Sequence, residues 1–485
     1  MTDVRLIDVS LRDGNQSLWG AVGVTTRTIE QLCPLLDQCG YEAIDIVSST
    51  IMAAAVRFHR EDPWQRLDLA RRLAPNTRLG FLTTGRRFVT FSRTPKVVLR
   101  LAYSLLRRHG ITRMWVADPM LDMASTIENA TMAKEEGFEE VIAGISYTSS
   151  PVHTDEYYAD KIAELDGCDS IDAIYLKDPC GLLSPERLES LLPKLQSRLT
   201  RLRIDEIHSH CTIGLAPMTL LKAADLGLTK LHCALPPLAN GNSHSNALQL
   251  VRNLAARGHR VSIDPVALER ASACLRREAA LFALPGGAPA DYDEAYYQHT
   301  LPGGVLTTAE RQLAEMGRAE MMPAVVEESI QVRADLGWPI AVTPFAQYIV
   351  TQASINVITG ERYRRITDEV VDLLLGEFGP MPGAVDPNLR DRAMATGRAK
   401  RARITIEPTL DDIKAKFGLR LADEDLLLRA VMPADEVDAM VRRRQSERGS
   451  LGSLLSSLED DKGPWSLSLT TGGSTVSFAG GGAAR

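Results

Sequence analysis

The chain alternates short β-branched segments with amphipathic helical segments, and this alternation constrains its fold more than any other feature. Eight strand–helix units fill roughly the first 260 residues, a number and length that match a (β/α)₈ barrel. An open doubly wound sheet is the alternative, but no glycine-rich dinucleotide fingerprint follows the first strand. We therefore predict an α/β fold, a (β/α)₈ TIM barrel, with strands at Val4–Arg12, Ala43–Ser48, Arg78–Thr83, Arg113–Ala117, Val141–Tyr147, Ala173–Leu176, Glu206–His210 and Lys230–Ala234.

The alternation stops after about Pro265, and helical patterns dominate the remainder. We expect the barrel domain to occupy residues 1–290 and a mainly helical accessory domain to occupy residues 291–445. Residues 446–485 are rich in Ser and Gly, a composition typical of flexible linkers. They are predicted to form a flexible tail.

Charge and composition exclude several classes of function. The 55 basic and 62 acidic residues give a net charge of −7 without long runs of one sign, whereas a nucleic-acid surface needs clustered Lys and Arg. Seven Cys without CxxC spacing suit a reducing compartment. We find no secretory signal and no apolar run approaching the ~18 residues of a membrane span. We expect a cytoplasmic protein with no transmembrane segment and no nucleic-acid partner.

Polar residues at the strand ends are the candidate site residues, because barrels of this type place their active sites at the C-terminal end. His208 and His210 lie two apart on the seventh strand, so both imidazoles point to the same face. Asp13, which follows the first strand, adds a carboxylate ligand. Polar packing at the rim and a turn contact between Asp13 and Arg12 are the alternatives. The three residues at one end favour a divalent ion such as zinc, manganese or cobalt.

Lys177 ends the sixth strand, and the residues alone leave its role open. An ammonium group beside a divalent cation is repelled or deprotonated. A deprotonated lysine can react with carbon dioxide to give a carbamate, which is anionic and can bind a metal. A surface ion pair with Asp178 is the alternative that the spacing alone favours.

Several segments resemble the biotin-dependent carboxyltransferases, which include domains of pyruvate carboxylase, transcarboxylase and the oxaloacetate decarboxylase α subunit. Residues 12–17 resemble the Arg-Asp-x-x-Gln-Ser opening of that family. The resemblance covers roughly residues 3–435. Further matches, in chain order, lie at residues 57–64, 147–158, 177–178, 181–183, 208–210, 301–304, 311–313 and 342–344.

The resemblance implies a site and a reaction. A divalent ion would be held by Asp13, carbamylated Lys177, His208 and His210. Thr343 matches the threonine that shuttles a proton between biotin and substrate, while Arg12 and Gln16 match positions that hold substrate or order the barrel mouth. Carboxybiotin on a mobile arm would exchange its carboxyl group with an enolate.

Two absent motifs indicate which partner proteins the chain would need. It contains neither the Ala-Met-Lys-Met biotin attachment motif nor a segment resembling an ATP-grasp loop. We expect biotin to arrive on a separate biotinylated carrier protein that is loaded by a biotin carboxylase subunit. We also expect the protein to bind a small-molecule acceptor and to form a homo-oligomer.

Residues around the expected substrate depart from the family pattern. Residues 47–53 replace a Trp-Gly-Gly-Ala-Thr-Phe-Asp segment, and Thr84 and Phe91 stand where the family has an arginine and a tyrosine. Phe345 and Ala346 replace two small polar residues. An arginine binds a carboxylate through two charge-assisted hydrogen bonds. We therefore predict an altered acceptor, with pyruvate a poor substrate.

Two other functions remain open at this point. A metal-dependent aldolase or lyase of the wider barrel superfamily would use the same ion without biotin. A non-catalytic scaffold is the third candidate, against which four intact metal ligands argue. The helical region and Thr343 favour the carboxyltransferase.

Overall fold

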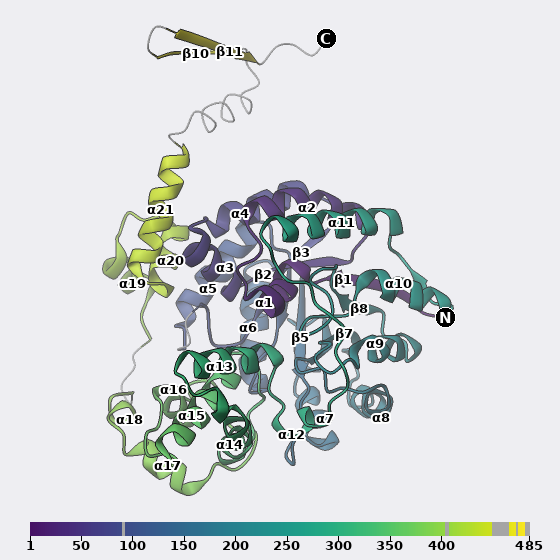
Figure 1. The fold of residues 1–485 in the computed structure, drawn as a ribbon, viewed down its shortest axis with the longest axis vertical. Helices are drawn as coiled ribbons and strands as arrows, with labels where there is room; N and C mark the ends of the chain where they lie inside the picture. The colour runs from purple at the N-terminus through teal and green to yellow at the C-terminus, as the bar shows by residue number, and fades with distance from the viewer. Residues whose placement is uncertain (90–92, 403–406, 449–464, 472–473, 481–485) are drawn as a thin grey trace.

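The computed structural model describes residues 1–89, 93–402, 407–448, 465–471 and 474–480 of the 485-residue chain. At its centre is a closed barrel of eight parallel strands, in which the first strand pairs with both the second and the eighth (Figure 1). The predicted (β/α)₈ barrel is therefore confirmed. Its strands are β1 (Asp3–Asp8), β2 (Ala43–Ser48), β3 (Arg78–Thr83), β4 (Arg113–Val116), β5 (Glu140–Ser146), β6 (Ala173–Asp178), β7 (Ile204–Ser209) and β8 (Lys230–Cys233). A short strand, β9 (Arg260–Val261), pairs with the start of β1.

Alternate residues along each strand face opposite sides of the barrel wall. Trp115 and Tyr175 belong to a small core inside the barrel, whereas their neighbours Met114 and Ile174 pack in the larger core between strands and helices. The surrounding helices are α1 (Asn15–Trp19), α2 (Thr26–Cys39), α3 (Ser49–Ala54), α4 (Pro63–Leu73), α5 (Lys96–Arg108), α6 (Met123–Glu135), α7 (Asp155–Ala163), α8 (Pro185–Gln196), α9 (Ala216–Asp225), α10 (Ala247–Ala256) and α11 (Pro265–Leu281).

Local sequence explains where several of these helices begin. In α4, α8 and α11 a capping residue is followed by proline at the first helical position, where no backbone donor is needed. The capping side chains of Asp62, Ser184 and Asp264 accept hydrogen bonds from backbone N–H groups of the first turn.

The first strand is shorter than the predicted Val4–Arg12. Asp8 accepts hydrogen bonds from the backbone N (3.1 Å) and Oγ (2.8 Å) of Ser10, and the chain then forms a π-helical turn at Ser10–Gly14. Arg12 and Asp13 therefore lie on this turn at the C-terminal end of the barrel rather than on the strand itself.

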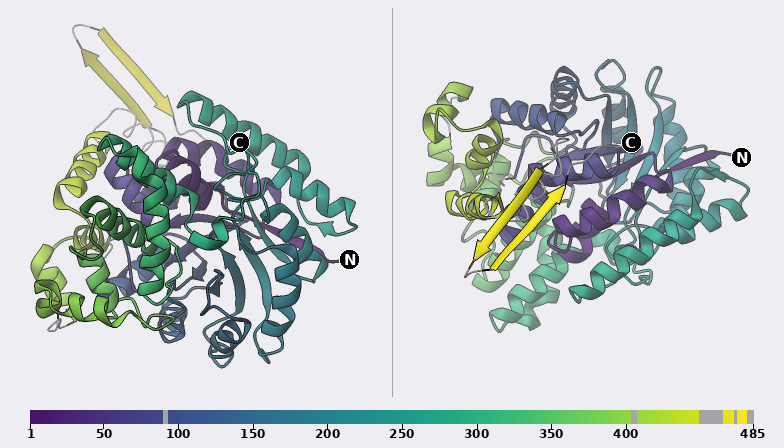
Figure 2. Two further views of the ribbon diagram at one scale, coloured as in Figure 1. Left: turned by 60° about the horizontal axis from the view of Figure 1, so that its bottom comes forward. Right: turned by 90° about the horizontal axis from the view of Figure 1, so that it is seen from above.

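The helices after the barrel fall into two groups, where we expected one accessory domain at residues 291–445. One group has a core of its own, formed mainly by α13 to α17. The other packs on the barrel: Leu427 and Met440 belong to the barrel's outer core, and Arg57 pairs with Glu436 at 2.7 Å. Both views of Figure 2 show the green and yellow-green helices on one side of the barrel. These helices are α12 (Tyr296–His299), α13 (Gly303–Glu315), α14 (Met322–Asp335), α15 (Phe345–Thr359), α16 (Asp368–Leu374), α17 (Pro387–Met394), α18 (Gly397–Ala402), α19 (Leu410–Phe417), α20 (Asp423–Val431) and α21 (Ala434–Arg448).

The region predicted as a flexible tail, residues 446–485, contains regular structure in its described parts. Helix α21 continues to Arg448, and β10 (Trp465–Thr471) pairs antiparallel with β11 (Ser474–Gly480). The Ser and Gly content of this region predicted a linker. Polar and apolar residues nevertheless alternate along β10, and this period of two is typical of a strand. Within the described ranges, no helix combines the length and the apolar character needed to cross a membrane.

Candidate metal centre and active site

Four buried side chains meet at the C-terminal end of the barrel. Asp13 lies on the turn after β1, His208 on β7, His210 directly after β7, and His244 in the loop between β8 and α10. One potential ligand atom of each residue lies within 4.8 Å of those of the others. The sequence predicted three of these residues, and it missed His244. Its presence in the polar loop after the eighth strand is the signal that could have indicated it, because such loops form the barrel mouth.

Asp13 is the centre of this cluster. Its Oδ2 atom lies 3.1 Å from His208 Nε2, 3.7 Å from His210 Nε2 and 3.9 Å from His244 Nε2, and 3.0 Å separates His208 Nε2 from His244 Nε2. Burial alone would raise the pKa of Asp13, but the charge of the Arg12 guanidinium holds it well below its usual range. Burial lowers the pKa of His208 and His244 far below the usual value, so both imidazoles are neutral. Neutral imidazole and carboxylate are the forms that bind metals.

Hydrogen bonds on the outer side of two rings show which nitrogen carries the proton. His210 Nδ1 lies 2.8 Å from the carbonyl of Asn242, which can only accept, so Nδ1 is the donor. Ser243 Oγ donates to the Leu238 carbonyl at 2.6 Å and can therefore only accept from His244 Nδ1, at 3.4 Å. In the neutral form of each ring, Nε2 then presents its lone pair to the Asp13 carboxylate. Lone pairs and a carboxylate so close together repel one another unless a cation lies between them, so the residues fit a divalent ion.

Lys177 is buried and its strand position directly pairs with that of His208. Burial, reinforced by the charge of Arg12, lowers the pKa of its amine to about 8. The alternative of a surface pair with Asp178 is wrong, because Asp178 is buried and accepts instead from Leu182 N, Leu183 N and Ser209 Oγ at 2.9, 3.0 and 2.8 Å. Lys177 thus lies beside His208, and its amine loses its proton more readily than that of an exposed lysine.

Arg12 is committed to other side chains in the site. Its guanidinium contacts Asp13 Oδ2 at 2.8 Å and binds Asp45 through Nε at 2.8 Å and through Nη2. Arg12 and Asp45 are both buried, so the Arg12 guanidinium is held between Asp13 and Asp45. Gln16 is half-buried on α1.

Thr343 lies just before α15, close to a buried cation. Its carbonyl oxygen accepts a long hydrogen bond of 3.5 Å from Arg87, which also donates to Thr84 Oγ1 at 3.2 Å. The guanidinium of Arg87 also lies 5.9 Å from the centre of the Phe345 ring. Burial lowers the pKa of Arg87 to about 10, although the charges of Tyr348 and Asp118 oppose this shift, and no ion pair within 4 Å joins Arg87 to a carboxylate of the described residues. Thr84 replaces the arginine of the family pattern, but the guanidinium of Arg87 lies within hydrogen-bond distance of it. Phe91 lies outside the described residues.

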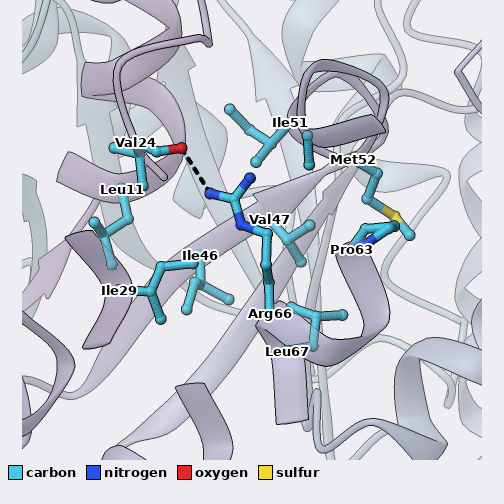
Figure 3. Close-up of a pocket in the computed structure, with 11 residues that line it drawn as sticks. Leu11, Val24, Ile29, Ile46, Val47, Ile51, Met52, Pro63, Arg66 and Leu67 are labelled. Atoms are coloured by element: carbon cyan, nitrogen blue, oxygen red, sulfur yellow. Dashed lines mark hydrogen bonds between the residues drawn. The ribbon is translucent and has the colours of Figure 1, made fainter. Parts of the chain in front are cut away.

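Most residues of the segment that departs from the family after β2 are buried, although Thr50 is exposed. Ser48 caps α3, and Ile51 and Met52 are buried. Both line a cavity of about 20 Å³ beside Arg66, which donates to the Val24 carbonyl at 2.7 Å (Figure 3). The altered residues at 51 and 52 therefore face the layer between barrel and helices.

Comparisons with known proteins match both parts of the chain. The sequence model of the HMGL-like family matches residues 3–274, and that of the conserved carboxylase domain matches residues 296–463. A pyruvate carboxylase subunit from Methanocaldococcus jannaschii is 32% identical over 441 residues, which cover 89% of this chain and 76% of that protein. The chain belongs to the biotin-dependent carboxyltransferase family. The C-terminal match thus favours the carboxyltransferase over the aldolase or lyase that the sequence left open.

Two further relatives belong to enzymes that are named for other substrates. The 2-oxoglutarate carboxylase large subunit of Hydrogenobacter thermophilus is 29% identical over 92% of this chain and 69% of that protein. The methylmalonyl-CoA carboxyltransferase 5S subunit of Propionibacterium freudenreichii is 27% identical over 89% of this chain and 86% of that protein. The carboxyl transferase domain of Rhizobium etli pyruvate carboxylase, solved with pyruvate and biocytin, has the same fold: its TM-score is 0.81 at 23% identity, covering 91% of this chain and 78% of that one.

Proposed function

We propose that this chain is a carboxyltransferase subunit that moves a carboxyl group between a biotinylated carrier protein and an enolisable acid. The observation that carries the proposal is the buried cluster at the barrel mouth, where Asp13, His208, His210 and His244 each offer one ligand atom within 4.8 Å of the others. A second protein, a biotin carboxylase subunit, would load the carrier. The named relatives, which are carboxylases and carboxyltransferases, support this reaction class.

Asp13, His208 and His210 would hold a divalent ion, with His244 and Lys177 completing the set. The amine nitrogen of Lys177 would attack the carbon of carbon dioxide and lose one proton to solvent, which leaves an anionic carbamate facing the ion. The lowered pKa of Lys177 supports this step, because only the neutral amine is nucleophilic. Bound there, the ion would act as a Lewis acid toward the acceptor's carbonyl oxygen.

Residues of the barrel mouth would bind the acceptor and move its proton. Arg87 would bind the acceptor's carboxylate, since it is a buried guanidinium that contacts Thr84, Thr343 and Phe345 and forms no ion pair within 4 Å among the described residues. The hydroxyl of Thr343 would carry a proton between the acceptor's carbon and the biotin nitrogen. Arg12 would keep Asp13 ionised and in place through its contacts with Asp13 and Asp45.

The test is carboxyl exchange between a biotinylated carrier and a panel of acceptors. The panel would contain pyruvate, larger 2-oxo acids and acyl thioesters, with oxaloacetate decarboxylation as the reverse assay. We expect carrier-dependent exchange with 2-oxo acids and no exchange in His208→Ala. Because Arg87 would supply the guanidinium that Thr84 lacks, the panel also decides whether pyruvate is the poor acceptor that the sequence predicted. Carbon–carbon bond cleavage without any carrier would instead identify a lyase.

Arg87→Gln tests the acceptor class on the same panel. Removing a charge-assisted contact to a carboxylate costs on the order of 1.5–3 kcal/mol, or roughly ten- to a hundredfold in affinity. We expect the KM for a 2-oxo acid to rise accordingly. An unchanged KM would show that another group binds the carboxylate.

A further inference from the structure

The Nδ1 atom of His208, which faces away from Asp13, contacts another histidine. The Nδ1 atoms of His210 and His244 instead contact a backbone carbonyl and a serine. Its Nδ1 atom lies 2.9 Å from Nδ1 of His232 on β8, and Nε2 of His232 lies 2.7 Å from Oε1 of Glu206 on β7. Trp115 Nε1 donates to the same carboxylate oxygen, and Arg113 donates to Oε2. All of these side chains are buried inside the barrel.

Packing holds the His232 ring in this orientation. It stacks on the ring of Tyr175 with a centroid distance of 6.0 Å and an interplanar angle of 6°, and the indole of Trp115 lies edge-on at 5.6 Å. These ring contacts and the two hydrogen bonds together favour this orientation of the ring. With the ring in this orientation, the donor in each of its two hydrogen bonds, to His208 and to Glu206, is set by which ring nitrogen carries the proton.

Counting donors gives these directions for a neutral His232, starting from Glu206. Arg113 and Trp115 have no acceptor atoms in these contacts, so the carboxylate of Glu206 accepts from both, and the ion pair with Arg113 keeps it charged. Glu206 therefore also accepts from His232 Nε2. In a neutral His232, Nδ1 is then an acceptor, and His208 Nδ1 must donate to it. The remaining nitrogen of His208, Nε2, is left with a free lone pair facing Asp13.

We propose that Glu206 and His232 are positioning residues that fix the tautomer of His208, so that its Nε2 atom is available to a metal ion. This inference rests on the proposed function, because it concerns the metal centre used there. In His210 and His244 the Nδ1 proton is instead held by the Asn242 carbonyl and by Ser243 Oγ, which lie in a nearby loop. His208 lies within β7, and the backbone carbonyls of this part of the sheet pair with the neighbouring strands. The acceptor for His208 Nδ1 is therefore a side chain of the barrel interior.

A pair of His232 variants tests the proposal through metal affinity. His232→Leu removes the acceptor for His208 Nδ1. His232→Gln keeps both bonds, since its amide carbonyl can accept from His208 and its amide N–H can donate to Glu206. We expect His232→Leu to weaken Zn²⁺ binding by roughly 10–100-fold in a chelator competition, and His232→Gln to restore most of it. Tyr175→Phe is the matched control. It removes a buried hydroxyl without a hydrogen-bond partner in the described structure, next to the same ring, and should leave the affinity unchanged.

Nitrogen-15 NMR of histidine-labelled, metal-free protein reads the tautomer directly. The wild-type spectrum should show His208 protonated at Nδ1 and bare at Nε2, and His232→Leu should show a mixture. Wild-type protein with a proton on His208 Nε2 overturns the inference, as does unchanged Zn²⁺ affinity in a folded His232→Leu protein. Neither measurement involves carboxyl transfer, so an error in the proposed reaction would leave both results standing.

Discussion

At the scale of single residues, Thr343 offers the sharpest test of the proposed reaction. Thr343→Ala should abolish carboxyl transfer while leaving the fold and the metal content intact, because only the hydroxyl can relay a proton over hydrogen-bond distances of about 2.6–3.2 Å. The assay is carrier-dependent exchange, with metal content measured on the same sample. Thr343→Ser keeps the hydroxyl and is expected to retain most activity. Equal rates in the alanine variant and the wild type would contradict the proton-relay role.

Asp8 gives a pH-dependent prediction away from the metal ligands. Burial raises the pKa of Asp8 to about 7, from 3.8 for an exposed carboxyl, so between these pH values the folded state holds a proton that the unfolded state has lost. Its contribution to stability therefore falls as the pH rises from 3.8 to 7. Asp8→Asn removes this titration. In denaturant unfolding at pH 5 and pH 8, the variant should gain on the order of 1–3 kcal/mol relative to wild type at the higher pH. A constant difference between the two proteins would contradict the shift.

At the scale of elements, α20 behaves as part of the barrel rather than of a separate domain. Leu427 is fully buried in the core that it shares with the barrel's outer face, while Leu419, in the loop before α20, is 77% exposed. Leu427→Ala should lower the free energy of unfolding by about 2–5 kcal/mol, because it leaves a cavity. Leu419→Ala, the matched control, should change it by less than about 0.5 kcal/mol. Similar values for the two variants would mean that α20 is not docked on the barrel.

At the scale of the whole molecule, a bound metal would join segments that are far apart in the chain. Asp13, His208 and His244 come from the turn after β1, from β7 and from the loop after β8, so an ion bound to all three stabilises the closed barrel. Protein purified without chelator should hold about one zinc, manganese or cobalt ion per chain by elemental analysis. Saturating metal at a hundred times its Kd should stabilise the apo protein by about 2.7 kcal/mol.

His208→Ala serves as the control for this prediction. It removes one ligand from the cluster, so both the bound metal and the metal-dependent rise in Tm should disappear. The Tm of the metal-free variant is the reference for the fold itself. A wild-type protein that keeps full activity after its metal has been stripped would refute the metal centre.

The sequence alone determined the barrel and three ligands of the candidate site. Strand and helix periods are local, so they show which residues form each element and which face each side chain occupies. The pair His208 and His210, two residues apart on one strand, and Asp13 at the end of another could therefore be placed at one end of the barrel. The family resemblance added Lys177, which the residues left open.

Only the tertiary structure decided which distant groups meet. His244 reaches the cluster from a loop 36 residues beyond His208, and His232 contacts His208 across 24 residues. The two groups of C-terminal helices were likewise indistinguishable in the sequence, because both carry helical periodicity. Periodicity specifies the face of an element, but the partner of that face is set by how the barrel closes and how its loops converge, and these long-range contacts leave no periodic signal in the chain.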